Sequence, residues 1–124
     1  MIRKDESIMK KTKMLKKNYE FKNVLAKGTY FSGRCIEVFV KENKITDLNY
    51  LGIAISVKLT NAVNRNHIKR LIRESYKKVE DNLKTGYSIV FLWKKKVEIS
   101  KADYQNISDD IKYIFDKAKI FYED

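Results

Sequence analysis

The sequence predicts an α+β domain with two layers, in which a mixed sheet packs against helices. Three observations indicate this class. Segment 35–41 alternates apolar and polar side chains, as a strand with two different faces does. Segments 50–57 and 87–93 are almost continuously apolar, which is typical of buried strands. A segment with helical spacing, 61–83, lies between them, so strands and helices are mixed along the chain.

The N-terminal segment 1–13 is predicted to be a basic, disordered arm. It has no apolar run long enough for a signal peptide. Residues 14–124 are predicted to form one domain, because they contain no proline, no repeat and no low-complexity linker. A chain of this length buries roughly two-thirds of its unfolded surface, so it can fold without disulfides.

The first helix is predicted over 19–27, with Asn18 as its cap and Gly28 as its end. An extra strand or hairpin is predicted near Phe31. The alternating strand follows, and its two faces differ in character. The core face carries Ile36, Val38 and Val40, and the other face carries Cys35, Glu37, Phe39 and Lys41.

The central helix is predicted to begin at Thr60 or Asn61 and to end before Gly86. Its apolar positions are Val63, Ile68, Leu71, Ile72, Val79 and Leu83. A last helix is predicted to start in a capping-box-like segment from Ser100 to Asp103. Its apolar stripe is Ile107, Ile111, Ile114, Phe115 and Ala118. The predicted order is α-β-β(-β)-α-β-α.

The charge of the chain is strongly positive and unevenly distributed. The net charge is +11, and residues 1–97 hold 23 Lys and Arg against 9 Asp and Glu. Such an excess attracts polyanions, with nucleic acid as the first candidate and an anionic membrane surface as the second. No apolar run approaches the length of a transmembrane helix. The single cysteine, Cys35, excludes an internal disulfide and favours a reducing compartment, so we expect a cytoplasmic protein.

The segment "NAVNRNHIKRLIRESYK", 61–77, carries the clearest functional signal. Like charges four residues apart on a helix repel by a few tenths of a kcal/mol per pair, and only Glu74 offsets them nearby. A phosphate backbone would compensate them, since Arg makes forked contacts to phosphate and Asn both donates and accepts. The pattern favours nucleic acid, and a plain charged surface remains the alternative. The row with this spacing is Asn61, Arg65, Lys69, Arg73 and Lys77.

The sequence predicts no catalytic residue, and no metal or cofactor bound by the chain. His67 is the only histidine, and no second His or Cys lies at ligand spacing. We interpret His67 as an RNA contact or a surface residue, and Cys35 as a small strand residue. The carboxylates show no paired arrangement that would indicate acid–base or two-metal chemistry.

The same segment strongly resembles the signature helix of the bacterial ribonuclease P protein subunit. The matching residues are Ala62, Val63, Arg65, Asn66, Ile68, Lys69, Arg70 and Arg73. The similarity extends to "LKKNYEFKNVLAKGTYFSGR" and "LGIAISVKLTNAV", and covers roughly residues 14–118. The resemblance implies a left-handed crossover from the strand near 50–57, through this helix, to the strand near 87–93. Periodicity alone could not predict it, because right-handed crossovers dominate.

The resemblance also implies a function. The family's protein assists a catalytic RNA, which removes 5′ leaders from precursor tRNAs using bound Mg²⁺. The expected partners are ribonuclease P RNA and precursor tRNA, and no protein or membrane partner is predicted. The helix expected to face the catalytic RNA presents Asn61, Arg65, Asn66, His67, Lys69, Arg70 and Arg73. A cleft between the first helix and the sheet is expected to hold the leader with Phe21, Leu25, Phe39 and Lys58.

Two residues depart from the family pattern. Leu25 stands where many members carry an aromatic residue, and His67 stands where arginine is usual. Three other functions remain as alternatives. A general RNA-binding or ribosomal protein would share the charge without the cleft. A helix-turn-helix protein is disfavoured because a strand leads into the basic helix. A self-sufficient endonuclease would cleave precursor tRNA without RNA.

Overall fold

The computed structural model describes residues 9–45 and 47–122 of the chain. Five strands form one mixed sheet in the order β1-β4-β5-β3-β2. Strands β1, β4 and β5 are parallel to one another, and β3 is antiparallel to both β5 and β2. The strands are β1 (Thr12–Met14), β2 (Thr29–Ser32), β3 (Ile36–Glu42), β4 (Asn49–Ala54) and β5 (Tyr87–Trp93).

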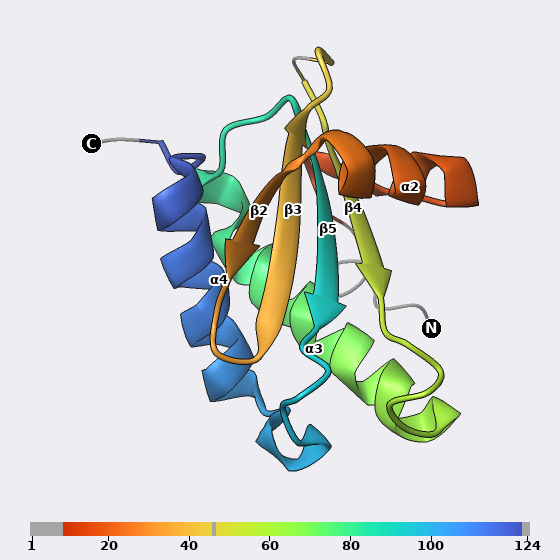
Figure 1. Cartoon of the computed structure of the whole chain (residues 1–124). Coiled ribbons are helices and arrows are strands. Elements are labelled where there is room, and N and C mark those ends of the chain that lie inside the picture. Colours follow the sequence, from red (N-terminus) through yellow and green to blue (C-terminus); the bar gives the residue numbers. More distant parts are fainter. Residues whose placement is uncertain (1–8, 46, 123–124) are drawn as a thin grey trace, which may run out of the picture.

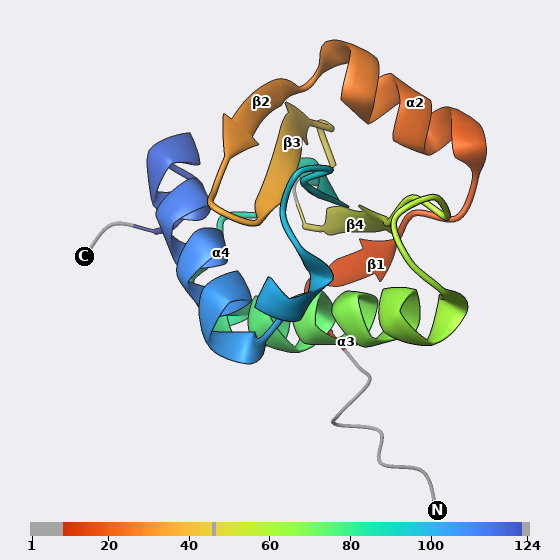
Figure 2. The ribbon, with the colours of Figure 1, turned by 60° about the horizontal axis from the view of Figure 1, so that its bottom comes forward.

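Three α-helices and two 3₁₀ turns accompany the sheet in the described residues. They are α2 (Asn18–Lys27), α3 (Ala62–Val79), η1 (Glu80–Asn82), η2 (Ile99–Lys101) and α4 (Tyr104–Ala118). Helices α3 and α4 lie together behind the sheet, and α2 crosses the upper end of its front (Figures 1 and 2). The predicted α+β class is confirmed. None of these helices is long and apolar enough to cross a membrane.

The connection from β4 through α3 to β5 is left-handed. Strands β4 and β5 are parallel neighbours, and α3 lies behind them with β5 to the left of β4 in Figure 1, where both strands point downwards. A right-handed crossover would place β5 on the other side of β4. This is the unusual feature that the family resemblance implied.

The core lies between the sheet and the α3–α4 layer. Ile36, Val38 and Phe91 are fully buried on the inner face of the sheet. Phe91 and Tyr76 of α3 both contact Phe115 of α4 edge-on, with ring centroids 6.0 and 6.1 Å from that of Phe115. Burial of apolar area contributes roughly 25 cal/mol per Å², so these rings dominate the stability of this layer.

The N-terminal part of the domain differs from the prediction. Residues 12 and 13 were expected in a disordered arm, but they pair with β4 at the edge of the sheet. The reason is Glu80, whose buried carboxylate accepts hydrogen bonds from the backbone N–H groups of Lys10 and Lys11 and from the Thr12 hydroxyl. This attachment is set by a residue far away in sequence. Residues 1–8 of the predicted arm lie outside the described residues.

Several predicted boundaries are also corrected. Asn18 is the first residue inside α2, and Lys17 is the N-cap. Glu20 accepts from the N–H groups of Lys16 and Lys17 at this helix start. The hydrogen bond from the Lys17 N–H is the main cause that lowers the pKa of Glu20. The last helix begins after Asp103, whose carboxylate accepts from the Asn106 N–H at 2.8 Å, and not at Ser100.

The central helix ends at Val79, and η1 follows it, so it stops before the predicted end near Gly86. Val63 was predicted on its apolar face, but it is 76% exposed. At about 100° per residue, Val63 lies about 140–180° from Ile68, Ile72 and Tyr76, so it points away from the buried stripe. The predicted strand near Phe31 is confirmed as β2, and the strand predicted over 50–57 is shorter, at Asn49–Ala54.

Candidate nucleic-acid interface

Helix α3 is fixed by a cap and by one buried stripe. Asn61 is the N-cap, and its Oδ1 accepts from the Asn64 N–H at 2.9 Å. Ile68, Ile72 and Tyr76 are fully buried against the core. Because this stripe cannot leave the core, the rotation of the helix is determined, and so are the directions of its polar side chains.

The basic side chains of α3 occupy one side of its exposed surface. Arg65, Lys69 and Arg73 are half-buried along the flank, whereas Asn66 and Arg70 are exposed. At about 100° per residue, His67 lies about 160° from Lys69 and thus faces away from this row. The structure therefore brings five of the seven predicted residues to one side of the helix, namely Arg65, Asn66, Lys69, Arg70 and Arg73. Asn61 is the N-cap, and His67 lies beyond Arg70, farther from the row.

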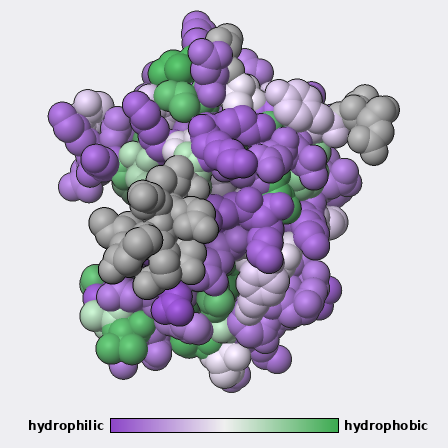
Figure 3. Space-filling model, turned by 180° about the vertical axis from the view of Figure 1, so that it is seen from behind, coloured by the Kyte–Doolittle hydropathy of each residue, from purple (hydrophilic) through white to green (hydrophobic). Residues whose placement is uncertain are grey.

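Most of this positive charge is not neutralised within the chain. Arg70 forms an exposed ion pair with Glu74, with 3.5 Å between Nε and Oε2. Such pairs contribute little, about 0.3–0.5 kcal/mol. Arg65 donates from Nη1 to the Thr60 carbonyl at 2.6 Å, which orients its guanidinium but removes no charge. Hydrophilic side chains dominate the molecular face seen from behind, the side on which α3 lies (Figure 3).

The front of the sheet carries aromatic side chains that the core does not use. Phe39 points away from Val38 and Val40, which are buried in the core. Its ring packs on Tyr30 of β2, with 5.2 Å between centroids and a tilted geometry. The Tyr30 hydroxyl donates to Glu37 at 2.8 Å, and this hydrogen bond is the main cause that raises the pKa of Tyr30.

Helix α2 closes the upper part of this front face. The ring of Phe21 lies directly over Gly52, where an added Cβ would be 2.6 Å from the phenyl Cε1. Gly52 therefore makes room for Phe21. Val90 lies between Gly52 and Phe39 in the sheet and is fully buried. Leu25, one helical turn after Phe21 on the same side of α2, is 36% exposed.

Below α2 the front face opens into a hollow that reaches α3. A cavity of about 330 Å³ is lined by the outer side chains of three neighbouring strands, Glu37, Ala54 and Leu92. Lys69 of α3 and Lys95, which follows β5, line the same cavity. The aromatic sheet face and the basic helix are thus parts of one continuous surface.

The predicted cleft residues are brought together in part. The Phe21 ring lies over Gly52, and Gly52 and Phe39 flank the buried Val90, about 10 Å apart at the backbone. Lys58 is exposed in the loop between β4 and α3, which also contributes Ser56 and Leu59 to the cavity. Sequence reasoning missed Tyr30, Leu92 and Lys95. The strand register could have found the first two, and the run of three lysines at 94–96 the third.

The surface offers charge and stacking area to a ligand. In residues 9–45 and 47–122, no three His, Cys, Asp or Glu side chains gather closely enough to hold a metal ion. Cys35 is buried, and burial is the main cause that raises the pKa of its thiol, which makes it a poor nucleophile. Exposed aromatic rings beside lysines suit an unpaired, negatively charged strand.

Comparisons with known proteins find relatives along most of the chain. A family model described as Ribonuclease P matches residues 9–119. The chain is 37% identical to the ribonuclease P protein component of Clostridium acetobutylicum over 115 residues, which cover 92% of this chain and 95% of that protein. It is 32% identical to the ribonuclease P protein component of Clostridioides difficile over 111 residues, or 89% of this chain and 95% of that one.

Solved structures share the fold. The RNase P protein of Staphylococcus aureus superposes with a TM-score of 0.76 at 31% identity, over 88% of this chain and 97% of that one. The RNase P protein of Thermotoga maritima superposes with a TM-score of 0.75 at 21% identity, over 85% of this chain and 96% of that one. The architecture is therefore retained at low sequence identity.

Proposed function

The chain belongs to the ribonuclease P protein family, and from this premise we propose that it binds two RNA segments at once. Helix α3 binds the catalytic RNA, and the front of the sheet binds the 5′ leader of precursor tRNA. The observation that carries this proposal is the hollow in which Lys69 of α3 meets the outer face of β3, β4 and β5. A strand lying on the sheet would pass directly to the helix that holds the RNA.

The α3 contact is electrostatic. Arg65, Lys69 and Arg73 present cations along one flank, at the spacing of successive helical turns. Their mutual repulsion is relieved when phosphates lie between them and counterions are released from the RNA. Asn66 and Arg70 add hydrogen-bond donors on the exposed edge of this flank.

The leader contact depends on stacking. A leader is single-stranded, so its bases are free to stack on aromatic rings. Phe39 supplies an accessible ring that Tyr30 braces, and Lys58 and Lys95 supply charge near the phosphate path. A mature tRNA has no leader and makes none of these contacts. The protein thus favours the substrate over the product.

The chemistry belongs to the RNA subunit in this proposal, and Mg²⁺ bound by that RNA supports phosphodiester hydrolysis. The chain contributes binding and charge. It acts in the cytoplasm, and its partners are ribonuclease P RNA and precursor tRNA. Its cations replace some of the magnesium ions that hold RNA phosphates close together, so the assembled enzyme needs less magnesium than the RNA alone.

The test is cleavage of a precursor tRNA by a bacterial ribonuclease P RNA at low magnesium, with and without the purified chain. We expect faster cleavage with the chain, because it carries a large positive charge. Equal rates would contradict the proposal. Cleavage by the chain alone would support a self-sufficient endonuclease. Equal affinity of the holoenzyme for precursor and mature tRNA would indicate a general RNA-binding protein.

A further inference from the structure

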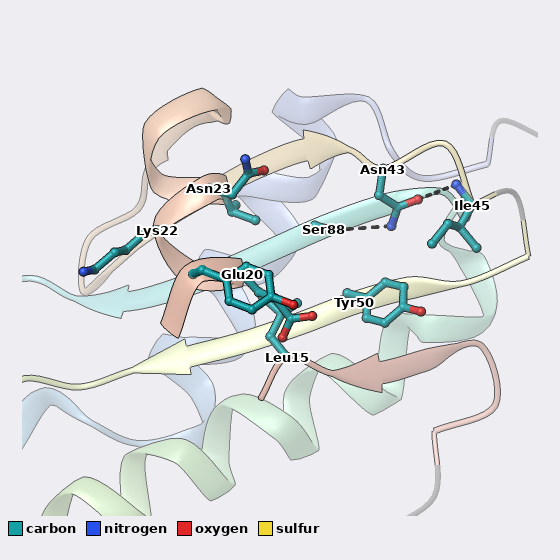
Figure 4. A pocket seen from close by; sticks show the side chains of 10 residues that line it. Leu15, Glu20, Lys22, Asn23, Asn43, Ile45, Tyr50 and Ser88 are labelled. Carbon is teal, nitrogen blue, oxygen red and sulfur yellow. Dashed lines mark hydrogen bonds between the residues drawn. The ribbon is translucent and has the colours of Figure 1, made fainter. Parts of the chain in front are cut away.

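A second groove lies on the opposite side of α2 from Phe21 and Leu25. It has a volume of about 690 Å³, within the roughly 300–1,000 Å³ of small-ligand sites. In Figure 4, Asn23 and Glu20 of α2 lie on one side of it, and Asn43, Ile45 and Tyr50 lie on the other. None of the residues predicted for the leader or for the catalytic RNA lines this groove.

Two tyrosines give the groove aromatic surface. Tyr19, in the first turn of α2, is 67% exposed, and its ring lies 6.0 Å from the Lys17 ammonium. Tyr50 of β4 is half-buried and lies on the same sheet face as Phe39. Leu15 and Ile45 complete the apolar part. Exposed aromatic rings beside apolar side chains form a surface on which a flat base can stack.

Polar groups at the rim supply hydrogen bonds. The Oδ1 of Asn43 accepts from the Ile45 N–H at 2.7 Å, so the orientation of this amide is fixed. Its Nδ2 is 3.4 Å from the Ser88 hydroxyl, a long contact that leaves donor capacity (Figure 4). Within the part of the chain that the structure describes, the Asn23 amide and the Tyr50 hydroxyl make no hydrogen bond. Amides can both donate to and accept from a base edge.

The surroundings favour an anion. The one carboxylate in the lining, Glu20, already accepts two backbone N–H bonds at the start of α2. Lys22 extends from α2 at the outer edge of the groove (Figure 4). Two further acidic residues lie close in sequence to the lining residues. They are Glu42 at the end of β3 and Asp47 in the loop before β4. The neighbouring cations are more numerous, at Lys16, Lys17, Lys22, Lys41 and Lys44.

We propose that this groove binds one unpaired RNA nucleotide, with its base on Tyr19 and Tyr50 and its phosphate toward Lys22. The inference rests on the RNA-binding function proposed above and adds a site to it. Helix α2, about 10 Å across, crosses this face and separates the groove from the part that carries Phe39. The nucleotide can therefore come from the catalytic RNA, or from a leader long enough to pass over α2.

The direct test uses the full chain, with adenosine monophosphate as the probe and ribose 5-phosphate as the matched control. We expect the side-chain amide signals of Asn23 and Asn43 in NMR spectra to shift with the nucleotide and not with the sugar phosphate. Tyr19→Ala should remove these shifts, and it should fold because Tyr19 is largely exposed. The proposal would be overturned if both probes shifted these amide signals equally, or if the nucleotide shifted neither of them.

The second test uses the holoenzyme and identifies the source of the nucleotide. Stacking on one ring typically contributes about 1–3 kcal/mol, so Tyr19→Ala should weaken the affected RNA by roughly five- to one-hundredfold. Loss of affinity for the catalytic RNA would assign the nucleotide to that RNA. Loss only for precursors with long leaders would assign it to the leader.

The matched control is Tyr113→Ala, which removes another exposed tyrosine from α4, 55% exposed against 67% for Tyr19, and should leave both affinities unchanged. Unchanged affinity for both RNAs in Tyr19→Ala, with Phe39→Ala still weakening precursor binding, would reject this groove and leave the proposed function intact. If Phe39→Ala also has no effect, the proposed leader site fails as well.

Discussion

The two faces of the sheet are made by the same strands and serve different purposes. On the inner face, Ile36, Val38 and Phe91 are fully buried under α3 and α4. On the outer face of the same strands, Phe39 and Leu92 are only half-buried. Both sheet faces carry large apolar side chains, but they differ in how much of them the helices cover. Helix α2 covers only the upper end of the outer face, so the side chains below it remain available to a partner.

This difference shows that hydrophobicity alone does not separate core from site. Phe39 of β3 and Phe91 of β5 are the same residue type on adjacent strands. Phe39 pairs with Val90, and Phe91 pairs with Val38. Phe91 contacts Phe115 in a dry layer, whereas Phe39 contacts Tyr30, whose hydroxyl donates to Glu37. An accessible aromatic ring beside polar and charged groups suits a nucleic acid. Substitutions on each face should therefore give different results.

The largest effect is expected on the inner face. Phe91→Ala should destabilise the protein by about 3–5 kcal/mol, because it leaves a cavity between Val38 and Phe115 that the packed layer cannot fill. The measurement is urea unfolding of the full chain, followed by circular dichroism. Phe39→Ala is the matched control, and we expect it to lose much less stability. Equal losses would mean that both faces belong to the core.

The next effect is on binding. Phe39→Ala should weaken the holoenzyme's affinity for a precursor tRNA by roughly five- to one-hundredfold, from about 1–3 kcal/mol of lost stacking. Affinity for mature tRNA should hardly change, because it has no leader. Equilibrium binding to both RNAs measures the difference, and thermal melts of the variant check its fold. A large fall in melting temperature, with both RNAs weakened equally, would assign Phe39 to the core.

The inner face was predictable from the sequence because local patterns determine it. Alternation placed Ile36, Val38 and Val40 in the core, and helical spacing did the same for Ile107, Ile111 and Ile114. The prediction for Val63 was wrong because its angular position, about 180° from Ile72, does not belong to the stripe with which it was grouped. The helix of the basic motif was also predictable, although its function came from the resemblance and from charge.

The outer face was less predictable because it depends on contacts between distant residues. Tyr30 reaches Phe39 only through the pairing of β2 with β3, and Lys95 reaches Lys69 only through the left-handed crossover. Strand β1 was missed because Glu80 holds it from the far end of α3. Neither composition nor local spacing contains such information.

The smallest effect is expected where the outer face meets α3, and salt dependence measures it. If about five side chains of α3 neutralise phosphates, binding of the catalytic RNA should show a log–log salt slope of roughly −3 to −5. Replacing Arg65 and Lys69 together with alanine should flatten the slope by about one unit for each cation removed.

The matched control is His67→Ala. His67 is exposed on the same helix, but it faces away from Lys69 by about 160°. Because His67 lies outside the row of Arg65, Lys69 and Arg73, this substitution should leave the slope nearly unchanged. An unchanged slope in the Arg65 and Lys69 double variant would make α3 a solvated charged face. If His67→Ala flattened the salt slope as much as the Arg65 and Lys69 double variant is expected to, the RNA would lie on the other side of the helix, away from the hollow. The helix and the sheet would then bind RNA independently, since no continuous surface would connect the two contacts.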